Sequence, residues 1–250
     1  MAGLVHIGLA GARGRMGRAV SDVLDTRNDV VVAARFDRTD HPDLAMCDVV
    51  IDFTEPAASV ELAQACAAAG GPALVIGATG FTPDQETLIE RAAERIAIVK
   101  SGNFSLGVNM LVGLVAEAAR RLPAADWDIE IVEAHHRMKK DAPSGTALML
   151  GEAAADGRDQ ALDEVRAPMR EGLSETERKI GEIGFSAIRA GGIVGEHQVI
   201  FAAGDEILTL SHSARDRALF ARGAVIAALW VKGRAPGLYG MQDVLGFRQI

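Results

Sequence analysis

Cysteine and aromatic residues are scarce in this sequence, and their scarcity excludes several kinds of site. The chain has 250 residues, of which two are cysteines, Cys47 and Cys66, and 4% are aromatic. Because the two cysteines form no CxxC pair and no Cys/His ligand spacing, we expect neither a disulfide framework nor a metal site. This use of cysteine fits a reducing cytoplasm.

An excess of positive charge is also absent. Lys and Arg number 26 against 34 Asp and Glu, which gives a formal net charge of −8. Such a chain repels phosphate backbones, so nucleic acid is not an expected partner. No basic stretch leads into an apolar one as in a secretory signal, and Gly70, Gly71 and Pro72 interrupt the uncharged stretch 62–83. We therefore expect a cytoplasmic protein with no membrane partner.

The first part of the sequence alternates between strand-like and helix-like patterns. Apolar runs predict strands at 4–10, 30–36, 49–53, 73–76 and 96–99, and helical spacing predicts helices at 15–26, 59–69 and 84–95. Strands that are apolar along their whole length and alternate with helices indicate a parallel sheet covered on both faces.

The pattern changes after residue 105. It predicts helices at 106–122 and 144–155, a half-exposed strand at 127–134, a charged surface excursion at 157–181, an antiparallel group of strands within 183–211 and a final apolar helix at 214–231. We expect an α/β fold with a doubly wound, Rossmann-like domain formed by residues 1–105 and 214–250. Residues 106–213 form a second, α+β domain with a mixed or antiparallel sheet.

A glycine-rich turn follows the first predicted strand. Gly11, Gly14 and Gly17 are spaced as G-x-x-G-x-x-G between a strand and a helix. In a dinucleotide site, such glycines allow a tight turn, a close approach of the backbone to a pyrophosphate, and close packing of the helix on the sheet. The helix N-terminus would attract the phosphates. An ordinary glycine-rich turn is the alternative, because this spacing is not the standard fingerprint.

Charged residues end the second predicted strand. Asp37 is placed to bond the ribose hydroxyls of NADH, and Arg38 or Arg35 to pair with the 2′-phosphate of NADPH. A solvated strand end is the competing interpretation. Two further loops, 77–80 and 101–104, also follow predicted strands, where open α/β sheets bind ligands.

The segment 133–146 carries the densest chemistry. It places two histidines and three permanent cations within the six residues 135–140 of an otherwise acidic chain. Pro143 is suited to a helix start, which would direct the backbone amides of Gly145 and Thr146 at an anion. A solvated basic turn is the plain alternative. A metal site using Glu133 and His135 lacks a third ligand.

Here the sequence resembles a known family, the 4-hydroxy-tetrahydrodipicolinate (dihydrodipicolinate) reductases of lysine biosynthesis. The resemblance rests on E-A-H-H-R-M-K-K-D-A-P-S-G-T at 133–146, A-G-A-R-G-R-M-G at 10–17, V-I-D-F-T-E-P at 50–56, G-A-T-G-F at 77–81, N-F-S-L-G-V-N at 103–109 and R-A-G-G-I-V-G-E-H at 189–197. These motifs occur in order over nearly the whole chain.

The resemblance implies a role for each matching residue. His135 would be the acid–base residue and Lys139 a second proton donor, with His136, Gly145 and Thr146 on the carboxylates of a small dicarboxylate substrate. NADH or NADPH would be held by Gly11, Ala12, Arg13, Gly14, Arg15, Met16, Asp37, Arg38, Gly77, Ala78, Thr79, Ser101, Gly102, Asn103 and Phe104. The family also implies a homotetramer assembled through the sheet of the second domain.

The sequence departs from the family at a few cofactor positions. Ala78 replaces a frequent threonine, Ser101-Gly102 replaces a frequent Ala-Ala or Ala-Pro, and the segment between Asp37 and Asp48 is short. These changes leave the preference between NADH and NADPH open.

Two other functions compete with this one. An aldehyde dehydrogenase needs a cysteine nucleophile facing the nicotinamide, and neither cysteine is placed for it. A redox-sensing dinucleotide-binding protein would leave the His/Lys cluster without a role.

Overall fold

The computed structural model describes residues 3–38, 40, 43–173 and 176–247. The chain forms two compact units, one made of residues 1–106 and 218–250 and the other of residues 107–217. Each unit has its own sheet and its own core. Among the described residues, no helix combines the length and the apolar character needed to cross a membrane.

The first unit is built on a parallel sheet. Its strands are β1 (Val5–Ala10), β2 (Val30–Phe36), β3 (Val49–Asp52), β4 (Ala73–Ile76), β5 (Ala97–Lys100) and β10 (Gly237–Tyr239), in the order β10-β5-β4-β3-β1-β2. Its helices are α1 (Arg15–Asp25), the 3₁₀ turn η1 (Leu44–Met46), α2 (Pro56–Ala69), α3 (Pro83–Ala93), α7 (Ala218–Val231) and α8 (Met241–Val244). The chain order reverses around β1, which lies between β2 and β3.

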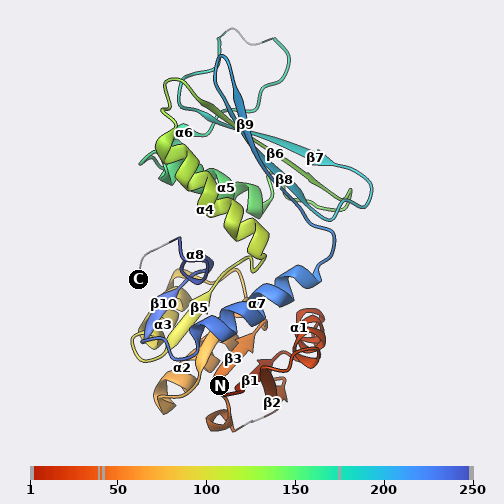
Figure 1. Cartoon of the computed structure of the whole chain (residues 1–250), viewed down its shortest axis with the longest axis vertical. Helices are drawn as coiled ribbons and strands as arrows, with labels where there is room; N and C mark the ends of the chain where they lie inside the picture. The colour runs from red at the N-terminus through yellow and green to blue at the C-terminus, as the bar shows by residue number, and fades with distance from the viewer. Residues whose placement is uncertain (1–2, 39, 41–42, 174–175, 248–250) are drawn as a thin grey trace. The chain divides into compact units, whose positions relative to one another are not determined.

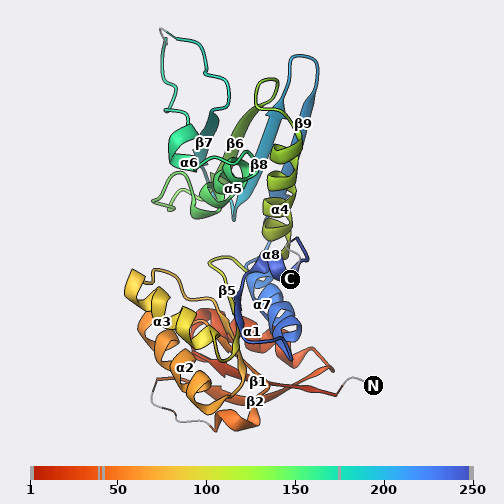
Figure 2. The same ribbon diagram turned by 90° about the vertical axis from the view of Figure 1, so that its left-hand side faces the viewer.

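Helices cover both faces of this sheet, as Figures 1 and 2 show. One core joins the strands to α1 and α7, and a second core joins them to α2 and α3. Local signals set the helix ends: Thr82 and Gln85 form a capping box at α3, and Gly70 ends α2 in the left-handed conformation. The doubly wound architecture predicted from the alternating pattern is confirmed.

The second unit carries a four-stranded sheet. It contains α4 (Leu106–Arg121), β6 (Asp128–His135), α5 (Gly145–Asp156), α6 (Leu162–Val165), β7 (Ile183–Arg189), β8 (Glu196–Ala202) and β9 (Ile207–Ser213). The strand order is β7-β6-β8-β9. Figures 1 and 2 show α4 and α5 against one face of the sheet, where Ile129, Ile131, Val199 and Phe201 form a core with them. No described helix of this unit covers the other face.

The structure differs from the sequence-based expectation at several points. The second sheet is mixed, which confirms the predicted fold class, but the strands of 183–211 do not form a single antiparallel group: β7 pairs in parallel with β6, and β8 and β9 are antiparallel neighbours. The final helix starts at Ala218 rather than at 214, because the amide of Ala214 still donates a hydrogen bond to the carbonyl of Gly195. The short elements α6, β10 and α8 were not predicted.

Candidate active site

The glycine turn after β1 has the backbone of a dinucleotide loop. Gly11 adopts a φ of +69°, a conformation that favours glycine. A Cβ at Gly17 would lie 2.1 Å from the carbonyl oxygen of Gly11, and one at Gly14 would lie 3.1 Å from it. Gly17 is therefore needed for close packing within the turn, whereas a Cβ at position 14 would be a tight contact that a small shift of the neighbouring backbone relieves.

Gly14 is also the N-cap of α1, and no side chain caps this helix end. By contrast, Thr82 and Ser144 cap α3 and α5 with their hydroxyls. The first amides of α1 lack acceptors within their helix, and an anion can take that place. Arg13 and Arg15, both exposed, flank the cap.

The charged end of β2 lies beside this turn. The Asp37 carboxylate is 3.4 Å from Arg13 Nε, and Arg38 lies 3.7 Å from Glu55 with its side chain 89% exposed. Arg35 instead pairs with Asp25 and Ser21 of α1. Of the two arginines considered for a 2′-phosphate, the structure thus leaves Arg38 accessible and engages Arg35 on the helix.

A cavity of about 340 Å³ opens next to these residues. Asp37 and Arg38 line it together with Gly11, and α2 contributes Leu62 and Ala65. It therefore has an apolar wall and a charged rim at the end of β1 and β2, as the adenosine end of a dinucleotide requires.

The two later loops lie at the same sheet edge, because each follows a neighbouring parallel strand. Gly77 donates its amide to the carbonyl of Asp52, and Ser101 donates its amide to that of Ile76. A Cβ at Gly102 would lie 3.6 Å from Thr79 Cγ2, so the loops approach each other. Phe104 is buried, with its ring 5.7 Å from that of Phe53. The structure thus brings together the residues predicted to hold a cofactor.

Asp52 is a feature of this edge for which we predicted no role. Its carboxylate is fully buried at the end of β3 and accepts hydrogen bonds from Ser59 Oγ at 2.5 Å and from Thr54 Oγ1 at 2.6 Å. Burial raises the pKa of Asp52 against these bonds. Thr54 Cγ2 lies 3.0 Å from where a Cβ of Gly11 would be. Asp52 therefore braces the loop that faces the glycine turn.

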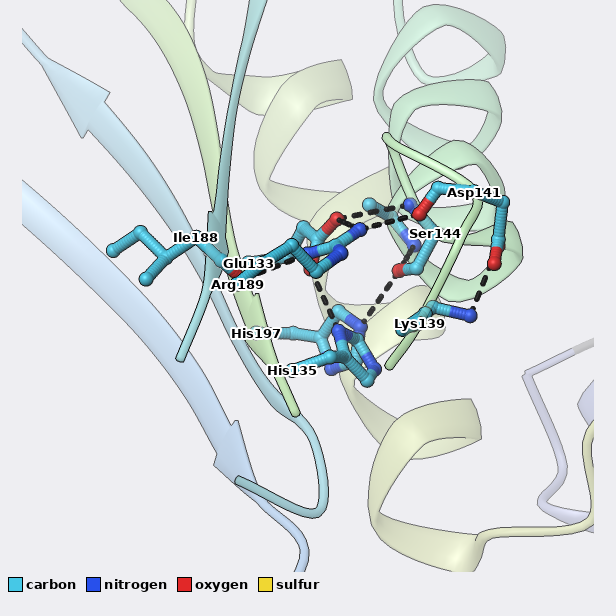
Figure 3. Close-up of polar contacts among 9 residues, drawn as sticks. Glu133, His135, Lys139, Asp141, Ser144, Ile188, Arg189 and His197 are labelled. Atoms are coloured by element: carbon cyan, nitrogen blue, oxygen red, sulfur yellow. Dashed lines mark hydrogen bonds and ion pairs between the residues drawn. The ribbon is translucent and has the colours of Figure 1, made fainter. Parts of the chain in front are cut away.

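The second predicted cluster lies at the end of β6, in the second unit. Glu133 and His135 are on the buried face of this strand, where His135 Nδ1 is 2.6 Å from Glu133 Oε2. Arg189 of β7 donates two hydrogen bonds of 2.7 Å to the Glu133 carboxylate, and the Ser144 amide donates a third at 3.0 Å. Figure 3 shows these contacts converging on Glu133.

Electrostatics keeps this carboxylate charged. Burial raises the pKa of Glu133, but the hydrogen bonds from Arg189, His135 and Ser144 outweigh burial and leave the pKa below its ordinary value. The same contact with Glu133 raises the pKa of Arg189. Arg189 and Glu133 therefore form an ion pair joined by two hydrogen bonds, the pairing that a buried charge requires, while Arg189 Nε has no hydrogen-bond partner among the described residues.

A second histidine borders His135. The rings of His135 and His197 are 5.1 Å apart and meet edge to face, and His197 Nε2 lies 3.2 Å from Ser144 Oγ. Burial first, and then the charge of His135, lower the pKa of His197 to about 4. His197 is thus neutral near pH 7 and gives His135 an uncharged wall.

Lys139 follows four residues after His135 in the loop that leads to α5. Its Nζ is 2.9 Å from Asp141 and its side chain is 22% exposed. Lys139 holds the pKa of Asp141 below its ordinary value. Lys140 is exposed, so the two neighbouring lysines occupy different surroundings.

The sequence predicts an anion site at the start of α5. Ser144 is its N-cap, with Oγ accepting from the Ala147 amide, and Gly145 and Thr146 are its first two residues. Pro143 therefore lies just before the cap rather than in the first helical turn. His136 Nδ1 is buried and has no hydrogen-bond partner within the described residues.

Sequence reasoning assigned no role to Glu133, Ser144, Arg189 or His197. One signal was available: Glu133 continues the buried face of Ile129 and Ile131, and a carboxylate in a core position needs partners. Across the described residues, no group of three potential ligands that would hold a metal ion is found.

The chain matches two family models, described as "Dihydrodipicolinate reductase, N-terminus" over residues 5–104 and "Dihydrodipicolinate reductase, C-terminus" over residues 107–245. It is 61% identical to 4-hydroxy-tetrahydrodipicolinate reductase of Caulobacter vibrioides and 47% identical to that of Roseobacter denitrificans, each over 98% of both chains.

Among solved structures, dipicolinate-bound dihydrodipicolinate reductase from Paenisporosarcina sp. TG-14 matches with a TM-score of 0.79 at 23% identity, over 96% of this chain and 99% of that one. At this identity the likeness concerns the fold. The two family models and the 61% identity carry the assignment, and they show that this chain belongs to the dihydrodipicolinate reductase family.

Proposed function

We propose that this protein is a 4-hydroxy-tetrahydrodipicolinate reductase. It reduces 4-hydroxy-tetrahydrodipicolinate to tetrahydrodipicolinate with NADH or NADPH and with loss of water, in the diaminopimelate/lysine pathway. Family membership and the 61% identical relative of that name support this activity. The observation that carries it is the cluster at the end of β6, where an anchored histidine and a lysine adjoin the start of α5.

The first unit is the dinucleotide-binding part. A pyrophosphate fits the turn from Gly11 to Met16, because the end of α1 is uncapped and Gly14 has no side chain. The loops from Gly77 to Thr79 and from Ser101 to Phe104 then flank the nicotinamide half. When bound, the cofactor supplies a hydride for C4 of the substrate ring.

Either nicotinamide cofactor is accommodated at the ribose. Asp37 accepts hydrogen bonds from the ribose hydroxyls of NADH, and among the described residues its carboxylate forms an ion pair with the exposed Arg13. Arg38, with its side chain 89% exposed, turns to a 2′-phosphate of NADPH by giving up a 3.7 Å contact with Glu55.

The second unit binds the dicarboxylate substrate. The amides of Gly145 and Thr146 begin α5, and the helix end attracts a carboxylate. His136 offers a buried ring nitrogen that has no hydrogen-bond partner in the described part of the chain, and a substrate oxygen would supply one.

His135 and Lys139 handle the proton. His135 Nδ1 is engaged by Glu133, which leaves Nε2 for exchange with the substrate. Lys139 is a fixed cation that stabilises negative charge on the ring as it is reduced and has a proton to give.

A thiol mechanism is disfavoured by the surroundings of the cysteines. Both are buried, and burial raises the pKa of both thiols, that of Cys66 to about 12 with a contribution from Cys47. Neither forms a nucleophilic thiolate near pH 7. Two free cysteines also agree with the proposed cytoplasmic location.

Assembly through the second sheet would complete the enzyme as a homotetramer. Its helix-free face exposes Ile188 (49%) and Ile207 (68%), which are apolar side chains suited to an interface between copies. Sedimentation or light scattering of the purified protein tests the assembly.

A steady-state assay tests the function and the catalytic pair. We expect the protein to oxidise NADH or NADPH when given enzymatically generated substrate. His135→Gln and Lys139→Ala should each lower kcat by roughly 10²–10⁴-fold, the usual contribution of general acid–base catalysis, with little change in NADH affinity. Lys139→Arg should retain only part of the wild-type kcat, because arginine keeps the charge but does not release a proton.

Lys140→Ala is the matched control, since this exposed neighbour is expected to be silent. No oxidation of either cofactor by the wild-type protein would refute the function. Near-normal kcat in both His135→Gln and Lys139→Ala would refute only the residue assignment.

A further inference from the structure

Glu133 is an unusual carboxylate for a strand in the core of the second unit. Its side chain is 1% exposed, yet it ends a row of apolar residues on the buried face of β6. Four hydrogen-bond donors surround it: two from Arg189, the amide of Ser144 and His135 Nδ1. A purely structural role would be served as well by an apolar side chain, without the desolvation of two charges.

The donors around Glu133 determine which nitrogen of His135 carries the proton. An ionised carboxylate can only accept hydrogen bonds, so the 2.6 Å contact requires a hydrogen on Nδ1. In neutral His135 the second nitrogen, Nε2, is then an acceptor, and in charged His135 it is a donor. Nε2 is therefore the nitrogen of His135 that gains and loses a proton.

Arg189 and Ser144 keep the carboxylate in place for this task. Arg189 stands opposite His135 in the parallel pairing of β6 and β7, and it also donates to the carbonyl of Asp141. It thereby ties the loop that bears Lys139 to the same carboxylate that anchors His135. Two oxygens held by a bidentate arginine have little freedom to rotate.

Gly195 and His197 border the part of the His135 ring that does not contact Glu133. A Cβ at Gly195 would lie 3.1 Å from His135 Nε2, so this buried glycine leaves the space next to that nitrogen open. His197 lies edge-on to the ring and stays neutral near pH 7, which avoids a competing charge.

We infer that Glu133 is a positioning residue that fixes His135 in the Nδ1–H form and aims its Nε2 at the substrate. Arg189 acts through Glu133 by holding the carboxylate aligned. This inference rests on the proposed function, because it presumes that His135 exchanges a proton during the reduction.

The test compares wild-type protein with Glu133→Gln by two readouts. Nitrogen-15 NMR of the histidine rings reports the tautomer of neutral His135 without any substrate. We expect the Nδ1–H form in the wild type and a loss of this preference in the variant. In the steady-state assay we expect kcat to fall by at least about 10-fold, a part of the roughly 10²–10⁴-fold that general acid–base catalysis contributes, with NADH affinity unchanged.

Glu130→Gln is the matched control. Glu130 lies on the same strand and pairs with an arginine, Arg178 at 3.1 Å, but the period of two in β6 places it on the opposite face to His135. It should leave both the tautomer and kcat unchanged. If Glu133→Gln fails to fold because Arg189 is left unpaired, the double variant Glu133→Gln/Arg189→Met removes both charges and is measured instead.

The outcomes separate the two claims. Wild-type protein that oxidises no cofactor would refute the proposed function, while the NMR result still decides the tautomer. An active wild type with the Nε2–H form, or a variant that keeps the tautomer and kcat, would overturn the role of Glu133. Loss of the Nδ1–H preference together with a fall in kcat supports it.

Discussion

Replacing Arg189 with methionine tests how much the buried charge of Glu133 depends on its arginine partner. The substitution removes both 2.7 Å hydrogen bonds to Glu133, whose side chain is 1% exposed, and leaves His135 and Ser144 as its donors among the described residues. It also removes the donations to the carbonyls of Ile188 and Asp141. Removing one partner of a buried ion pair costs about 3–5 kcal/mol, and we expect a loss of unfolding free energy in that range near pH 7.

The loss of unfolding free energy in this variant should depend on pH, and the surroundings of Glu133 determine the direction. In the wild type its pKa is lowered, so its contribution is complete above the ordinary glutamate pKa and is lost only as pH falls through the lowered value. Burial is the largest single influence on this carboxyl, so we expect it to prevail once Arg189 is removed and to raise the pKa of Glu133. A carboxyl of this kind favours the folded state at low pH and loses that effect as pH rises.

As pH falls from about 7.5 to about 5.5, the variant should therefore regain part of its lost unfolding free energy relative to the wild type. The wild-type contribution of Glu133 is constant over this interval. Trp127 reports on the second unit by fluorescence, and Trp230→Phe removes the only other tryptophan, which lies in α7 of the first unit. Urea unfolding is followed in this background at both pH values. A loss below about 1 kcal/mol, or an equal loss at both pH values, would refute the reasoning.

Three further predictions concern the glycine turn and the end of β2 beside it. Arg38→Ala should weaken NADPH by about 1.5–3 kcal/mol and leave NADH unchanged, because one charge-assisted hydrogen bond is lost; equal losses by titration would remove Arg38 from the 2′-phosphate site. Gly17→Ala should destabilise the fold, since its Cβ would meet the Gly11 carbonyl oxygen at 2.1 Å, whereas Gly14→Val should weaken NADH binding while the fold survives. Thermal unfolding and cofactor titration of both glycine variants separate these outcomes.

The first unit could be predicted from sequence because its signals are local. Strands buried on both faces are apolar along their length, and helix ends carry their own markers, such as Pro83 after the capping Thr82. The strand β10 could not be found this way. Three residues, Gly237–Tyr239, are too few for a periodic pattern, and they form a strand only because β5 offers a free edge.

Parallel pairing in the second sheet was also beyond local reasoning. Residues 183–211 alternate with turns as antiparallel strands do, and β8 and β9 obey that pattern. β7 pairs with β6 instead, from which it is separated by α5 and α6. Such a crossover depends on how α5 packs on the sheet, which is a tertiary effect.

The strand β6 shows which part of the site can be predicted from local sequence and which part cannot. The period of two in β6 places Glu133 with Ile129 and Ile131, so the sequence alone marks it as a carboxylate in a core position. What the sequence does not provide is the partner, because Arg189 lies 56 residues away and reaches Glu133 only through the register of β6 and β7. A one-residue slip would turn Arg189 to the other face and leave the buried carboxylate unpaired. The register of the second sheet is therefore a condition for the ion pair of Glu133 with Arg189, and through Glu133 for the inferred Nδ1–H form of His135.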